Sequence, residues 1–183
     1  MSEFEGYNTQ YYENLLEMYA GSMEEISRRR WEFIDHIKAK LVLDYGCGNN
    51  AFTLYKPDNV IVDSYDVGTI GSAPYPQTGI RHDRYDLICL WDVLEHVDWA
   101  RSPDADMLDA ITKADAVAVT VPILPVDTPL ETWKHYKPGE HLSYFKVGGI
   151  IDLVENLGFI IQLHGQPECP PRKDIHSFLF RRK

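Results

Sequence analysis

The sequence predicts an α/β domain whose sheet is mostly parallel, with one reversed strand at the end. Short, continuous apolar runs recur at 41–43, 60–62, 87–91 and 116–121, as expected of strands that are buried on both faces. Segments with helical or loop character separate these runs. The last two runs, 159–163 and 177–180, are joined by a proline-rich connection too short for a helical crossover, so we expect them to pair antiparallel.

Helical periodicity marks the segments around these strands. Thr9 is a candidate N-cap for an opening helix with an apolar face at 15–19, and a second helix places Trp31, Ile34 and Ile37 at spacings of three. A later helix around 150–157 ends at Gly158. We expect one domain overall, with residues 1–39 as an N-terminal helical lid or cap and residues 40–183 as the ligand-binding part.

Composition limits the functional classes. The chain has 183 residues, 44% of them hydrophobic and 25% charged, which suits one globular domain. The formal net charge of −10 argues against broad binding to nucleic acid. No apolar stretch approaches the length of a membrane span, the N-terminus does not resemble a signal peptide, and the three cysteines form no disulfide or zinc pattern. We therefore expect a cytoplasmic protein with no membrane partner.

The strongest local signal is the segment LVLDYGCGNNAF, residues 41–52. An apolar strand delivers Asp44, and Gly46 and Gly48 follow at once. Glycines let the backbone turn tightly and let a ligand lie against the main chain, and the amides of a following helix would point at that ligand. A tight turn without a ligand is the alternative interpretation of this loop.

Two further strand ends carry acids. Asp66 lies 20 residues past Gly46 and ends the second strand, where a carboxylate can accept hydrogen bonds from ribose hydroxyls; Asp63 would lie inside or beside that strand. The third strand, in YDLICLWDVLEHV, ends in Asp92, Glu95 and His96. Ligands of open α/β sheets bind at the carboxyl ends of the strands, so these side chains belong to the same predicted site.

These motifs resemble those of the class I S-adenosylmethionine-dependent methyltransferases of the small-molecule type, similar to the ubiquinone-biosynthesis O-methyltransferases. LDYGCG matches the Asp/Glu-x-Gly-x-Gly motif, VDSYD resembles the acidic second motif, and YDLICLWDVLEHV matches the fourth-strand segment of the family. The late segment HYKPGEHLSYFKVGGIIDLVENLGF also resembles the family. Together they span most of residues 40–180 and imply a Rossmann-like methyltransferase fold.

The resemblance implies S-adenosylmethionine as cofactor and a small-molecule methyl acceptor. It places Asp66 on the ribose, and it places the remaining cofactor-binding residues at the methionine and sulfonium end: Asp44, Gly46, Cys47, Gly48, Trp91 and Asp92. In some related O-methyltransferases an acid-x-x-Glu-His cluster binds a divalent metal, and Asp92, Glu95 and His96 have that spacing. We assign no metal ligand.

A hydroxyl acceptor would need a general base, because its proton must leave as the methyl group arrives. Histidine suits that role near neutral pH, and the candidates are His96, His135 and His141. A structural role is the alternative for His141. The nearby aromatic residues Trp133, Tyr136 and Tyr144 would form either a wall over a planar acceptor or part of the core. The N-terminal tyrosines Tyr7, Tyr11 and Tyr12 would close over the site.

The sequence departs from the family in its middle. Asn50 stands where a third glycine is common, and Pro57 shortens the first crossover helix. The segment IGSAPYPQTGIRHDR, residues 70–84, is too short for a helix and a strand, so we expect the fold to be abbreviated around the third strand of the family. Asp83 is the candidate for an adenine contact there.

Other functions remain open at this point. A nicotinamide-dependent oxidoreductase would explain the match of GCGNNA to Gly-x-Gly-x-x-Ala, but the chain is short for a separate catalytic domain. A degenerate methyltransferase fold that binds a partner is the non-enzyme alternative, favoured by the shortened middle. A nucleic-acid methyltransferase conflicts with the acidic charge. A second copy could cover the abbreviated sheet edge, so a homodimer is also open.

Overall fold

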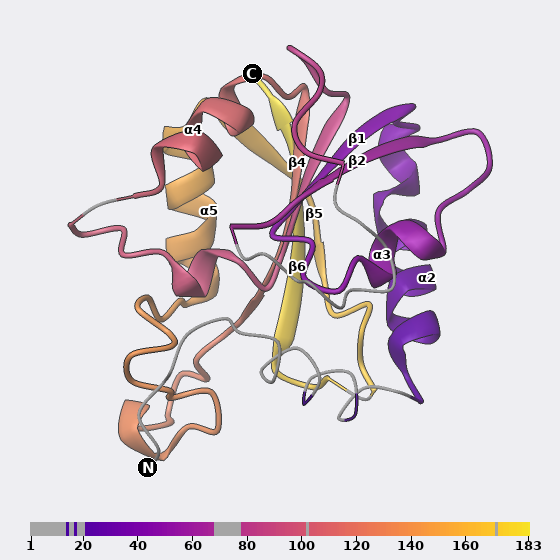
Figure 1. The fold of residues 1–183 in the computed structure, drawn as a ribbon. Helices are drawn as coiled ribbons and strands as arrows, with labels where there is room; N and C mark the ends of the chain where they lie inside the picture. The colour runs from indigo at the N-terminus through magenta and orange to yellow at the C-terminus, as the bar shows by residue number, and fades with distance from the viewer. Residues whose placement is uncertain (1–13, 15–16, 18–20, 68–77, 102, 171) are drawn as a thin grey trace.

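The computed structural model describes residues 14, 17, 21–67, 78–101, 103–170 and 172–183 (Figure 1). Most of the predicted opening helix and Tyr7, Tyr11 and Tyr12 lie outside these residues. The helices are α2 (Met23–Ile34), α3 (Ala51–Leu54), α4 (Ala105–Thr112) and α5 (Val147–Asn156), with 3₁₀ turns at Asp35–Ile37, Leu94–His96 and Leu130–Thr132. The strands are β1 (Leu41–Tyr45), β2 (Ile61–Tyr65), β3 (Leu87–Trp91), β4 (Ala116–Pro122), β5 (Phe159–Gly165) and β6 (Ile175–Arg182).

The strands form one six-stranded sheet in the order β2-β1-β3-β4-β6-β5. Strands β1 to β4 pair in parallel, whereas β6 runs antiparallel to both β4 and β5. The predicted α/β class, the parallel sheet and the antiparallel last hairpin are therefore confirmed. The parallel strands end at the same edge of the sheet, which places the residues that follow β1, β2 and β3 beside one another.

Helices cover both faces of the sheet, with α2 and α3 on one side and α4 and α5 on the other (Figure 1). The α2 face is a core of buried residues that includes Trp31, Phe33 and Ile34 packed against Val42 and Cys89. The indole of Trp31 stacks on Phe52 with ring centroids 4.2 Å apart, and its Nε1 donates a 3.0 Å hydrogen bond to the Phe52 carbonyl. Helix α2 is thus a packed layer of the domain, and its amino-terminal half lies at the edge where the strands end.

No strand forms in residues 78–86, which confirms the predicted abbreviation for the described part of that segment. Instead, this connection covers the outer edge of β2. Thr78 and Ser64 exchange hydrogen bonds, and the buried Asp63 carboxylate accepts from the backbone and guanidinium of Arg81 and from the Tyr85 hydroxyl. This short loop therefore satisfies polar groups at the outer edge of β2 that an additional strand there would otherwise pair.

The predicted end of the later helix agrees with the structure. Gly158 adopts a φ of +95° directly after α5, which ends the helix at a position that favours glycine. All three cysteines are free thiols, and Cys47 and Cys89 are buried. Within the described residues, no helix has both the length and the apolar character needed to cross a membrane.

Candidate functional site

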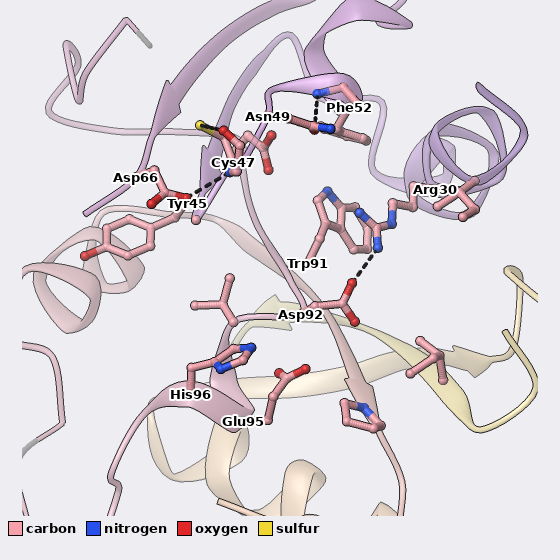
Figure 2. Close-up of a pocket in the computed structure, with 18 of the residues that line it drawn as sticks. Arg30, Tyr45, Cys47, Asn49, Phe52, Asp66, Trp91, Asp92, Glu95 and His96 are labelled. Atoms are coloured by element: carbon pink, nitrogen blue, oxygen red, sulfur yellow. Dashed lines mark hydrogen bonds and ion pairs between the residues drawn. The ribbon is translucent and has the colours of Figure 1, made fainter. Parts of the chain in front are cut away.

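A cavity of about 370 Å³ lies where β1, β2 and β3 end. Its lining contains all the predicted cofactor-binding residues at the glycine loop and the strand ends and the three candidate bases: Asp44, Gly46, Cys47, Gly48, Asp66, Trp91, Asp92, His96, His135 and His141. Helix α2 adds Met23, Ile26, Ser27 and Arg30 to the wall. Figure 2 shows the side chains that converge from β1, β3 and α2. The carboxyl edge of a parallel sheet is the place where α/β domains bind their ligands.

The glycine loop requires glycine for two separate reasons. Gly46 has a φ of +76°, and a Cβ atom at this residue would lie 2.5 Å from Cγ2 of Val93, so no other residue fits without a shift. The amides of Gly46 and Cys47 donate to the Tyr65 carbonyl at 2.7 and 3.0 Å, which fixes the loop to the end of β2. At Gly46 and Gly48 the main chain therefore borders the cavity without a side chain.

The structure separates the two acids of the second strand as the sequence predicted. Asp66 lines the cavity and accepts a 2.8 Å hydrogen bond from the amide of Gly48. Asp63 lies inside β2, faces away from the cavity lining and binds the loop that covers β2. Asp83, the adenine candidate, is exposed and does not line the cavity, so the structure gives it no place in this site.

Asp44 is a buried acid with no partner among the described residues. Its side chain is 1% exposed, and neither carboxylate oxygen makes a hydrogen bond in the described structure. Burial raises the pKa of Asp44 to about 7; nearby Asp66 adds to this rise, and the positive charge of Arg30 opposes it. A buried carboxylate in a cavity wall is costly unless a cation or donor reaches it, so this position suits a cationic ligand group.

Asp92 is held by two arginines that the sequence did not indicate. Its carboxylate pairs with Arg30 at 2.9 Å and with both terminal nitrogens of Arg172 at 2.8 and 2.9 Å, and Figure 2 shows the pair with Arg30. These two arginines hold the pKa of Asp92 well below its usual range despite burial. The buried Glu168 joins both guanidiniums from the β5–β6 connection. These contacts join residues that lie 62 to 138 positions apart in the sequence, so no local motif could have indicated them.

The three candidate bases all reach the cavity. Nδ1 of His96 lies 2.9 Å from the carbonyl of Glu140, an acceptor that assigns the ring proton to Nδ1 and the lone pair to Nε2. Burial lowers the pKa of His96 and brings those of His135 and His141 to about 4. The rings of His96 and His141 meet edge to face with centroids 4.9 Å apart. All three imidazoles are therefore neutral at neutral pH.

Glu95 completes a cluster with two of these histidines. Its side chain is 2% exposed, and burial together with the charge of Asp92 raises its pKa well above the usual range. One ligand atom each from Glu95, His96 and His141 lies within 4.8 Å of the others, a donor set that suits a borderline cation such as Zn²⁺. Asp92 is not part of this group, because the two arginines hold its carboxylate, and the third member of the cluster is His141.

The predicted aromatic wall does not form. Trp133, Tyr136 and Tyr144 contact one another, with ring centroids 5.6 to 6.3 Å apart, but none of them lines the cavity. They pack beside His135 and His141 and so support the segment that carries these histidines. Trp133 is buried and the two tyrosines are half-buried, and all three lie outside the two hydrophobic cores of the described residues, so they form a separate aromatic cluster.

Residues 19–163 match the sequence model of a methyltransferase domain family. The chain belongs to this family. The match covers the whole glycine loop, the acidic strand ends and the histidine segment of the cavity. Family membership sets aside the nicotinamide-dependent oxidoreductase that the glycine loop alone left open. The search of curated proteins found no match to this sequence.

Solved structures share the fold of the methyltransferase. The magnesium protoporphyrin IX methyltransferase from Synechocystis PCC 6803, with bound SAH, matches with a TM-score of 0.64 and 17% identity over 97% of this chain and 96% of its own. A SAM-dependent methyltransferase from Archaeoglobus fulgidus gives 0.65 and 15%, covering 94% and 100% of the two chains. An O-methyltransferase family protein from Burkholderia thailandensis gives 0.67 and 13%, covering 94% and 58%. These likenesses confirm the Rossmann-like methyltransferase fold.

Proposed function

We propose that this enzyme transfers the methyl group of S-adenosylmethionine to a small-molecule acceptor by in-line displacement. The observation that carries the proposal is the single cavity in which the glycine loop, Asp44, Asp66 and His96 meet at the carboxyl edge of the sheet. The similarity to the ubiquinone-biosynthesis O-methyltransferases stays a prediction within this proposal.

The cavity lining offers groups that suit the methionine, sulfonium and ribose parts of S-adenosylmethionine. The unpartnered carboxylate of Asp44 suits the ammonium of the methionine end. The side-chain-free backbone at Gly46 and Gly48 allows the cofactor to lie against the main chain, with Cys47 between them. Asp66 stands where it can accept hydrogen bonds from ribose hydroxyls, and Trp91 and Asp92 border the sulfonium end.

The bound cofactor supplies a methyl group that its sulfonium has already activated. The task of the protein is then to align the acceptor and to remove its proton. We propose that Nε2 of His96 accepts the proton of the methyl acceptor. The Glu140 carbonyl accepts a hydrogen bond from the other ring nitrogen, and burial keeps the imidazole neutral. His141 and His135 border the same space and are the alternative bases.

Several features support a small acceptor. The name of one structural neighbour, the magnesium protoporphyrin IX methyltransferase, points to a small-molecule acceptor for that protein. We propose that residues 1–39 cap the cavity, since α2 already contributes to its wall.

A cytoplasmic location agrees with the three free cysteines. A homodimer remains a proposal.

The alternative is a methyltransferase-fold protein that binds a partner and has lost its chemistry. The feature that favours it is the abbreviated connection between β2 and β3, whose described residues 78–86 form no strand and where an adenine contact was expected. This alternative predicts a folded protein that binds no cofactor.

Calorimetric titration with S-adenosylmethionine and S-adenosylhomocysteine tests the proposal. We expect micromolar binding by the wild type and loss of that binding in Asp66→Ala. Asp58→Ala is the matched control, because Asp58 is exposed before β2 and away from the cavity. Binding that survives Asp66→Ala would remove Asp66 from the site. A folded wild type that binds neither compound would favour the partner-binding alternative.

A further inference from the structure

One fully buried and three half-buried charges form a closed ring between α2, the end of β3 and the β5–β6 connection. Glu168 accepts from Nε of Arg30 at 2.6 Å through one oxygen and from Arg172 through the other, and Asp92 accepts from both arginines in turn. We call Arg30, Asp92, Arg172 and Glu168 the charge ring. Arg29 adds 2.9 Å hydrogen bonds to the carbonyls of Pro167 and Cys169, so α2 holds this connection at several points.

Three members of the charge ring line the cavity, and one does not. Arg30, Asp92 and Arg172 border the ligand space, whereas Glu168 is fully buried behind them and cannot touch a ligand. Glu168 carries the one fully buried charge of the ring, and a buried charge is costly unless it is paired, so both arginines are held against it. The ring thereby fixes two positive charges at the cavity wall, where one of them can meet a ligand.

The geometry selects Arg30 as that charge. Its guanidinium lies over the ring of Trp91, with Cζ 4.9 Å from the centroid (Figure 2). It is also close enough to Asp44 for its positive charge to oppose the rise in pKa of that carboxyl. Nε is used by Glu168 and Nη2 by Asp92, while Nη1 makes no hydrogen bond within the described part of the chain. Nη1 is thus the donor that remains for a ligand.

We propose that Glu168 is a positioning residue that fixes Arg30 to receive the carboxylate of the cofactor's methionine end. This inference rests on the proposed function. The amino-acid end of S-adenosylmethionine carries one ammonium and one carboxylate, and this end of the cavity offers an unpartnered carboxylate at Asp44 beside a guanidinium at Arg30. Glu168 and Asp92 clamp the guanidinium from two sides and leave its third nitrogen for the carboxylate.

Two ligands that differ only in the amino-acid end test this role. S-adenosylhomocysteine carries the carboxylate, whereas 5′-methylthioadenosine has the same nucleoside and thioether without it. We expect Glu168→Gln to weaken binding of S-adenosylhomocysteine by about tenfold or more, the effect of one charge-assisted hydrogen bond, and to leave 5′-methylthioadenosine within about twofold of the wild type. Glu32→Gln, an exposed acid on the same helix as Arg30, is the matched control and should change neither affinity.

The outcomes separate this inference from the proposed function. Binding of S-adenosylhomocysteine by the wild type decides the function, and the selective loss in the variant decides the role of Glu168. Equal weakening of both ligands, or no weakening of either, overturns the positioning role. If Glu168→Gln does not fold, Glu168→Asp keeps the charge while shortening the side chain, and the same selective loss is expected and the same results overturn it.

Discussion

The amide of Gly48 donates a 2.8 Å hydrogen bond to the carboxylate of Asp66, which joins the glycine loop to the residue that follows β2. The Tyr65 carbonyl, one residue earlier, accepts from the amides of Gly46 and Cys47. The loop and the strand end are thereby held together by three main-chain amides. These hydrogen bonds fix the loop within the protein itself, which leaves less ordering to be done when a ligand binds there.

Gly46→Ala should abolish cofactor binding and destabilise the protein. Its positive φ strains any other residue, by about 1–3 kcal/mol, and the added Cβ would overlap Val93. Gly79→Ala is a matched control, since Gly79 has a φ of +77° but open space around it and no place in the cavity lining. We expect Gly79→Ala to lower the free energy of unfolding while leaving affinity unchanged. Equal affinity for both variants in calorimetry would mean that the loop tolerates a side chain.

Asp44→Asn should stabilise the ligand-free protein at high pH and weaken cofactor binding. The pKa of Asp44 is raised to about 7, so the folded state keeps a proton that the unfolded state releases near pH 4, and wild-type stability falls as pH rises between these values. The amide removes this loss, worth about 2–4 kcal/mol above pH 7. Chemical denaturation at pH 4 and pH 8 should show a gain only at pH 8. Asp58→Asn should show none, and a gain at both pH values would contradict the assigned cause.

The methyl-transfer rate should fall on the acid side with a midpoint below 6.5, the ordinary value for histidine. Burial lowers the pKa of His96, and the base must be unprotonated to accept the acceptor's proton, so the rate is lost as pH drops through that lowered value. His96→Gln should reduce the rate by about 10²–10⁴-fold with little change in cofactor affinity. Exposed His36→Gln is the control. The conversion of S-adenosylmethionine, followed with acceptors from a screen, measures both the pH profile and the loss of rate. An unchanged pH profile in His96→Gln would assign the role of general base to His141 or His135.

Zinc should inhibit methyl transfer, whereas a chelator such as EDTA should leave the rate of methyl transfer unchanged. The cluster of Glu95, His96 and His141 suits Zn²⁺, and a bound ion would occupy the lone pair that His96 needs for the proton. Mg²⁺, which prefers oxygen ligands, should have no such effect. Activity assays with each metal and with EDTA check this, and His141→Ala should weaken the inhibition. Loss of activity in EDTA that Zn²⁺ restores would instead make the cluster a functional metal site.

Local sequence determined most of the architecture. Apolar runs bounded by glycine and acidic residues located every strand to within a few residues, because burial on both faces demands continuous hydrophobic segments. The positions of Asp44, Asp66 and His96 at or just after strand ends then followed from topology, since parallel strands bring their carboxyl ends to one edge. The short segment between Asp66 and Tyr85 was enough to predict the abbreviated middle of the fold.

Only the tertiary structure decided how the charges in the cavity are paired. Asp92 looked like a partner of Glu95 and His96 in the sequence, but Arg30 and Arg172 hold it, and His141 takes its place in the cluster. The aromatic residues near His141 pack against one another beside the cavity, a choice that periodicity cannot distinguish from a wall. These pairings join residues tens of positions apart, and their geometry depends on how α2 and the β5–β6 connection pack on the sheet, which no local pattern encodes.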